Sequence, residues 1–258
     1  MDLVDSHCHL DAAEFDPDRQ DVIERARAAG VMRQVVPAVD AAGWPKLRDV
    51  CAADRGLFPA YGLHPICLRS HQPAHLVELR AWIERERPVA IGECGLDFFL
   101  DDLDAGTQQR YFDAQLELAR EYDLPVIVHA RHAVEAVFLA IRRVGHLRGV
   151  VHSFSGSPEQ ARQLWDAGFL IGLGGPVTYP RANRLRKLAA TMPIEYLLLE
   201  SDAPDQPDAA HRGKRNEPAR IVEVLDTIAG LRGQDPAEIA AATSANAERL
   251  FAMPMRAS

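Results

Sequence analysis

Short runs of apolar and β-branched residues alternate with longer amphipathic stretches from one end of the chain to the other. The short runs predict eight strands, at residues 3–5, 33–37, 57–61, 89–91, 126–128, 150–151, 170–172 and 196–199. The amphipathic stretches predict a helix after each strand, at residues 17–29, 44–54, 74–85, 106–122, 134–144, 158–167, 182–191 and 218–231. A further helix is expected over residues 235–251. The pattern is therefore a β-α unit repeated eight times, followed by an extra C-terminal helix.

Glycines and prolines support these boundaries. Glycine stands where three of the helices need a left-handed residue to end them, at Gly30, Gly145 and Gly168. Proline stands at the start of three helices, at Pro17, Pro158 and Pro218. Eight β-α units within 258 residues have the size and rhythm of a (β/α)8 TIM barrel. A doubly wound open sheet is the alternative fold. No linker or shift in composition interrupts the chain, so we expect residues 1–258 to form a single domain.

Charge and composition exclude some classes of function. The 29 Lys and Arg residues against 37 Asp and Glu residues leave a net charge of −8, which does not suit a protein that coats nucleic acid. A polyanion would have to be captured locally. No apolar run approaches the ~18 residues of a transmembrane helix, so no membrane partner is expected. The four cysteines form no C-x-x-C pair, and neither they nor the N-terminus indicates secretion; we expect a cytoplasmic protein.

Residues that could bind a metal stand just after several of the predicted strands. His7 and His9 are two residues apart on an extended segment, so both imidazoles point the same way. Because the ends of barrel strands meet at one rim, the side chains beyond strands one, four, five, six and eight are expected to converge. They offer four imidazoles and two carboxylates, from His7, His9, Glu93, His129, His152 and Asp202.

This set of ligands is enough for two divalent ions with Glu93 between them. Mixed His and carboxylate ligation suits Zn²⁺ or Mn²⁺, and Mg²⁺ is also usable. A pair of such ions is typical of hydrolases. The remaining histidines that are scattered over predicted helices and loops, His71, His75, His132 and His146, are interpreted as ordinary polar residues.

Six segments resemble the successive motifs of the TatD family of metal-dependent deoxyribonucleases, at residues 7–11, 62–65, 92–97, 125–129, 152–156 and 200–204. The match spans nearly the whole chain. Residues 98–102 and 174–181 further resemble the YjjV-type members. Phe98 and Phe99 stand where TatD-type members usually have a Tyr followed by a polar or basic residue, which leaves the shape of the substrate pocket open.

The resemblance implies a barrel of the metal-dependent hydrolase type and exonuclease-like cleavage of phosphodiester bonds at DNA ends, most simply single-stranded ends. It places His7, His9 and Asp202 on one metal and His129 and His152 on the other, with Glu93 shared. No obligate protein partner is implied.

Other residues are candidates for catalysis and substrate binding. The resemblance puts His64 near the substrate, as a phosphate ligand or an acid. Arg131 could bind a phosphate or form an ion pair at the rim. Glu200 could orient a histidine, receive a proton or form a salt bridge at the end of the strand. Together with Glu93 and Asp202, His64 and Glu200 complete the expected catalytic group.

Two basic segments follow the last two strands. Arg212, Lys214 and Arg215 surround a glycine shortly before a helix start and are expected to bind phosphate. A second basic group, ending in Arg184, Arg186 and Lys187, suits either phosphate binding or the solvated face of a helix.

Three other functions compete with the nuclease. A small-molecule ester or amide hydrolase with this architecture often bridges its metals with a carboxylated lysine, and none of Lys46, Lys187 and Lys214 ends strand four. A D-aminoacyl-tRNA deacylase would use the same metals as a nuclease. A protein with structural metals is disfavoured, because the carboxylate-rich set leaves coordination positions open.

Overall fold

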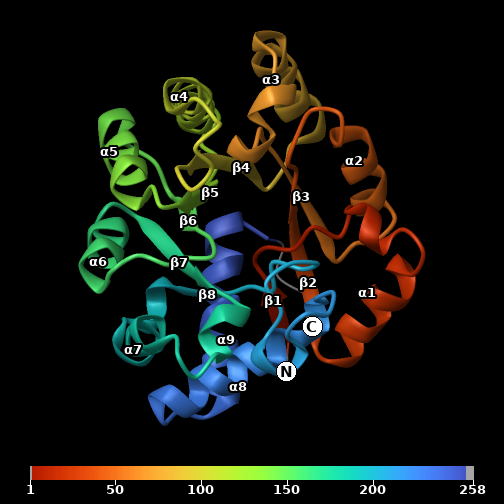
Figure 1. The fold of residues 1–258 in the computed structure, drawn as a ribbon. Helices are drawn as coiled ribbons and strands as arrows, with labels where there is room; N and C mark the ends of the chain where they lie inside the picture. Colours follow the sequence, from red (N-terminus) through yellow and green to blue (C-terminus); the bar gives the residue numbers. More distant parts are fainter. Residues whose placement is uncertain (1, 254–258) are drawn as a thin grey trace.

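Each predicted strand exists, and the helices that follow the strands surround the barrel that the strands form (Figure 1). The computed structural model describes residues 2–253. The strands are β1 (Leu3–Asp5), β2 (Val31–Pro37), β3 (Leu57–Tyr61), β4 (Ala90–Asp97), β5 (Val126–Arg131), β6 (Gly149–Val151), β7 (Phe169–Leu173) and β8 (Leu197–Leu199). The helices are α1 (Arg19–Ala28), α2 (Trp44–Ala52), α3 (Pro73–Glu86), α4 (Ala105–Glu121), α5 (Val134–Val144), α6 (Pro158–Asp166), α7 (Asn183–Thr191), α8 (Ile221–Arg232) and α9 (Pro236–Phe251).

The strands are parallel and follow the order of the chain, β1 to β8. The first and last strands meet at a seam, where the Ser6 amide donates to the Leu199 carbonyl at 3.0 Å and the Asp202 amide donates to the His7 carbonyl at 2.9 Å. A doubly wound sheet reverses its strand order at a switch point, and this sheet does not. The (β/α)8 barrel prediction is confirmed.

The barrel interior is filled by one apolar layer. Each strand contributes one buried residue to it, from Val4, Val35, Ala60, Ala90, Ile127, Val150, Leu170 and Leu198. The extra helix α9 packs Ala247, Leu250 and Phe251 against this layer and lies behind the strands in Figure 1. Arg33 of β2 forms an ion pair with Glu248 of α9. The helix therefore covers the end of the barrel opposite the cluster of predicted ligands.

β4 and β5 extend furthest beyond their predicted carboxyl ends. β4 continues from Ile91 to Asp97, and β5 continues to Arg131, so Glu93 and His129 lie within strands rather than after them. The apolar pattern ends at Gly92, but the ladder continues, with Asp97 opposite Arg131. These strand ends were missed because their inward side chains are polar and buried in the site rather than in an apolar core.

Helix boundaries differ by a few residues. α1 begins at Arg19, two residues after Pro17, and Pro218 begins a 3-10 turn before α8. Pro158 is the first residue of α6, whose start is capped by Ser157 and Gln160. Gly30, Gly145 and Gly168 have φ values of 89°, 68° and 87°, as expected for residues that end helices. None of the helices in residues 2–253 is long and apolar enough to cross a bilayer.

Candidate metal centre

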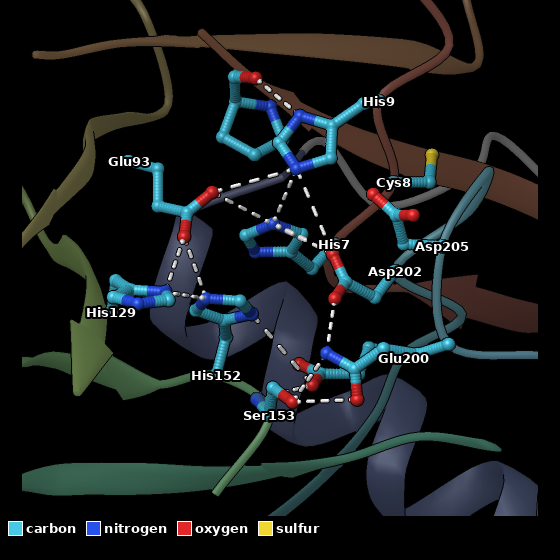
Figure 2. Close-up of polar contacts among 12 residues, drawn as sticks. His7, Cys8, His9, Glu93, His129, His152, Ser153, Glu200, Asp202 and Asp205 are labelled. Atoms are coloured by element: carbon cyan, nitrogen blue, oxygen red, sulfur yellow. Dashed lines mark hydrogen bonds and ion pairs between the residues drawn. The ribbon is translucent and has the colours of Figure 1, made fainter. Parts of the chain in front are cut away.

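All six predicted ligands lie together at the carboxyl end of the barrel (Figure 2). His7 and His9 follow β1, Glu93 lies in β4, His129 in β5, and His152 and Asp202 follow β6 and β8. Cys8 faces the opposite way, with Sγ 3.7 Å from Gln34 Oε1. The alternation of side chains along an extended segment therefore separates the two histidines from the cysteine between them.

Glu93 stands between two groups of imidazoles. Its Oε2 lies 3.2 Å from His7 Nε2 and 3.5 Å from His9 Nε2. Asp202 Oδ1 lies 3.5 Å and 3.6 Å from the same two nitrogens. Two nitrogens and two carboxylate oxygens thus face one small space.

The other carboxylate oxygen of Glu93 faces a second group. Oε1 lies 2.6 Å from His152 Nε2 and 3.2 Å from His129 Nδ1. His64 Nε2 is 2.8 Å away. Despite these distances, Oε1 is buried without a hydrogen bond of good geometry. A buried anion surrounded by nitrogens that do not donate properly to it is what a cation site requires, so the donor set fits divalent metal.

Neighbouring groups fix the outer nitrogens of two imidazoles. His9 Nδ1 lies 3.1 Å from the Pro37 carbonyl, and His129 Nε2 lies 3.0 Å from Asp97 Oδ2. Each outer nitrogen must carry the proton that it donates, so the inner nitrogen presents a lone pair to the centre. Asp97 was not predicted as a site residue. Its only signal in the sequence is its place at the end of the residue 92–97 motif.

His64 has the opposite arrangement. Its Nδ1 accepts a hydrogen bond from the Ile66 amide at 3.0 Å, so in the neutral ring the proton is on Nε2. Burial lowers the pKa of His64 to about 4. His64 therefore faces Glu93 as a neutral donor, not as a ligand through Nε2.

Glu200 is fully buried beneath His152. Its Oε1 accepts from the Ser153 amide and lies 4.0 Å from His152 Nδ1. Burial raises the pKa of Glu200 to about 8. Gly172 makes room for this carboxyl, because a Cβ at that position would stand 2.1 Å from Glu200 Oε2.

Two further polar residues hold the loop after β8. Gln206 donates to Asp202 Oδ2 and to Ser153 Oγ. Asp5 accepts from the Ser201 hydroxyl at 2.6 Å and from the Ser201 amide at 2.9 Å. Neither residue was predicted, because each acts through a partner that is not adjacent in the sequence.

The charged groups of the centre shift one another's pKa values. Burial alone would raise the pKa of Glu93, but His152, His64 and His7 outweigh it and hold that pKa well below its usual range. Burial lowers the pKa of His7. Burial also opposes protonation of His152, yet Glu93 raises its pKa to about 10. A proton on His152 thus takes the place that a metal cation would take, and metal binding would release it.

A cavity of about 780 Å³ opens above the centre. Its lining includes His64, Glu93 and Arg131. Five carboxylates line it, from Asp11, Glu14, Glu93, Asp202 and Asp205, and Arg131 is the one Lys or Arg residue in the lining. The Arg131 guanidinium has no ion-pair partner within residues 2–253; it lies over the Phe99 ring, with Cζ 3.6 Å from the ring centroid.

The predicted basic segment lies apart from this cavity. Arg212 and Lys214 are exposed, and neither lines the cavity. Arg215 is paired with Asp18 at 2.7 Å and Glu217 at 2.9 Å and stacks over Phe15. These contacts give Arg215 a structural role. Phosphate binding by Arg212, Lys214 and Arg215 stays a prediction.

Comparison with known proteins matches this geometry to one family. A sequence model described as TatD related DNase matches residues 4–252. The uncharacterized metal-dependent hydrolase YjjV of Escherichia coli is 40% identical over 255 residues, covering 98% of each chain. The crystal structure of YjjV, a TatD homolog, superimposes with a TM-score of 0.95 at 39% identity, again over 98% of each chain. A protein of Cronobacter sakazakii named 3'-5' ssDNA/RNA exonuclease TatD is 37% identical over 257 residues, covering 96% of this chain and 97% of its own.

Proposed function

This chain belongs to the TatD-related DNase family of metal-dependent hydrolases, and from that premise we propose that it is a deoxyribonuclease that removes nucleotides from the ends of single-stranded DNA. The observation that carries the proposal is the position of Glu93, whose two carboxylate oxygens face two separate groups of imidazoles. The Cronobacter relative is named as an exonuclease on single-stranded DNA and RNA, which supports the choice of substrate.

We infer that the centre holds two divalent ions, Zn²⁺, Mn²⁺ or Mg²⁺. His7, His9 and Asp202 would hold one, His129 and His152 the other, and Glu93 both. When bound, such a pair supplies a nucleophile from water near neutral pH and neutralises charge on phosphate oxygens.

The remaining polar residues act on the substrate or on the ligands. His64 offers an N–H at the cavity floor and would donate it to a phosphate oxygen or to the departing alkoxide. Because its pKa is about 4, His64 is neutral near pH 7 and favours hydrogen bonding over proton transfer. Asp97 positions His129, and Glu200 holds the loop at Ser153.

The shape of the site supports the proposal of exonuclease action. The centre lies at the bottom of a cavity formed by the loops at one end of the barrel, which suits a chain terminus better than the middle of a strand. The test compares a linear single strand with the same strand closed into a circle, incubated with metal. The linear strand should lose nucleotides stepwise while the circle resists. Efficient cutting of circles, with linear strands untouched, would contradict end-directed cleavage.

A second candidate activity is the hydrolysis of an aminoacyl ester, as in a D-aminoacyl-tRNA deacylase, or of a small ester or amide. The acidic side chains of Asp11, Glu14 and Asp205 line the same cavity and would attract an ammonium group. Release of a D-amino acid from its tRNA, with single-stranded DNA untouched by the same metal-loaded preparation, would favour this activity over the nuclease.

We place the protein in the cytoplasm. All four cysteines, Cys8, Cys51, Cys67 and Cys94, are free thiols, which suits a reducing compartment. Fractionation of cells that produce the chain would test this.

A further inference from the structure

Two exposed aromatic residues that the proposed chemistry does not use lie beside Arg131, which lines the cavity. Phe98 is 37% exposed and Phe99 is 48% exposed, directly after β4. The Arg131 guanidinium covers one face of the Phe99 ring, and the His132 ring meets Phe99 edge-on with centroids 5.2 Å apart. Arg131 itself lines the cavity.

The backbone that carries Phe99 is tied to the metal centre by one carboxylate. Asp97 Oδ1 accepts from the Phe99 amide at 3.0 Å, while Oδ2 holds His129 Nε2 at 3.0 Å. The Phe98 amide donates to the Arg131 carbonyl at 2.9 Å, which ties the same turn to β5. The ring and the guanidinium are therefore held at a set position from the reacting centre.

The cavity lining is mainly acidic, so a nucleic-acid ligand would need contacts to its bases as well as to its phosphates. Five carboxylates and one guanidinium line the cavity, so a polyanion gains little from the lining itself. Arg131 is exposed, and nucleobases stack on arginine guanidinium groups and aromatic rings regardless of sequence. Stacking supplies affinity for single-stranded nucleic acid that the charge of the lining does not.

We propose that Phe99 and Arg131 form a nucleobase-binding subsite, which stacks the base of a nucleotide beside the scissile phosphate. The inference rests on the proposed nuclease function and adds a substrate requirement to it: an unstacked base near the strand end. Duplex ends, whose bases are paired and stacked, fit the subsite less well than single-stranded ends.

The experiment uses two short single strands of the same length, one normal and one with abasic nucleotides at both ends. KM and kcat are measured with metal present, and affinity is measured with metal removed. Phe99→Ala should weaken binding of the normal strand by about tenfold, as expected for one lost base stack. The same variant should leave binding of the abasic strand and hydrolysis of a small chromogenic phosphodiester unchanged. Phe99→Trp keeps an aromatic ring for stacking and should bind the normal strand as tightly as the wild type.

Matched variants separate base stacking from charge and from the general loss of an exposed apolar side chain. Arg131→Lys keeps the positive charge but removes the planar guanidinium. It should therefore weaken binding of the normal strand more than binding of the abasic strand. Leu139→Ala removes another exposed apolar side chain, on α5 and outside the cavity lining, and should change nothing.

The outcomes are distinct. If Phe99→Ala weakens both strands equally, Phe99 only positions Arg131 for phosphate and the subsite is refuted. If wild type degrades both strands equally well, the subsite is refuted and the nuclease function stands. If wild type neither binds nor degrades either strand, the nuclease function and the subsite both fall.

Discussion

Asp97 holds His129 in one orientation, because His129 Nε2 lies 3.0 Å from Asp97 Oδ2 while the opposite nitrogen, Nδ1, faces Glu93 at 3.2 Å. The carboxylate thereby makes Nδ1 the better donor to a metal. Asp97→Asn should weaken binding of one metal ion by about 10- to 100-fold and lower activity in parallel. Metal titration by calorimetry measures the effect. Asp101→Asn, on an exposed side chain nearby, is the control; equal metal affinity in the two variants would remove Asp97 from the centre.

Glu93 should determine how many ions the protein retains. Glu93→Gln keeps the size of the side chain but removes the charge that faces both groups of imidazoles, so fewer ions per chain are expected than in the wild type. Elemental analysis after saturation with metal measures this number. Glu78→Gln changes an exposed glutamate on α3 and should retain the wild-type number. Full occupancy in Glu93→Gln would show that Glu93 is not shared.

His64 should matter for turnover and not for metal content. Its Nδ1 is occupied by the Ile66 amide, so its Nε2 carries a proton and is a donor. His64→Ala should lower kcat by about a hundredfold, the effect typical of losing one donor to a developing negative charge, with metal content unchanged. His152→Ala should lose metal. Loss of metal in both variants would make His64 a ligand.

The exposed pair Arg212 and Lys214 tests whether the segment after β8 binds the strand. Replacing both with Gln should weaken oligonucleotide binding and lower its salt dependence by roughly one unit of slope per lost contact. Turnover of a small phosphodiester should hardly change. Arg55→Gln, an exposed arginine between α2 and β3, serves as the control. Equal salt slopes in the variant and the wild type would exclude this segment from the substrate site.

Arg215 should act on stability instead, and the effect should depend on pH. Its hydrogen bonds lower the pKa of Asp18 from 3.8 to about 2. A folded-state pKa below the unfolded value means that this contribution is complete above about pH 4 and is lost as the pH falls through 2. Arg215→Gln should therefore lower the urea midpoint at pH 7, and the difference from the wild type should shrink below pH 4. A difference that does not change with pH would assign the effect to the Phe15 contact.

The barrel and the convergence of the candidate ligands were predictable because both depend on local pattern. The β-α rhythm identified every strand, and strand ends of a barrel meet at one rim, which placed His7, Glu93 and Asp202 together. The extensions of β4 and β5 were not predictable from periodicity, because polar residues near the ends of these strands interrupt the apolar pattern.

The features that the sequence did not predict depend on contacts between residues far apart in the chain. Nothing near Asp97 in the sequence indicates His129, 32 positions away, and nothing near Arg215 indicates Asp18, 197 positions away. A basic residue beside a glycine looks the same whether its partner is a phosphate or a carboxylate. The orientation of His64 likewise depends on one backbone amide, which no residue type specifies.

The seam between β1 and β8 also bears on how the protein is made. His7 and His9 precede the other candidate ligands in the chain, whereas Asp202 and the strand before it close the seam nearly 200 residues later, and α9 follows after that. During synthesis the two histidines are therefore made long before Asp202, and the full set of candidate ligands exists only after β8 has been made. A chain that stops before β8 would therefore contain His7 and His9 but could not form the complete centre.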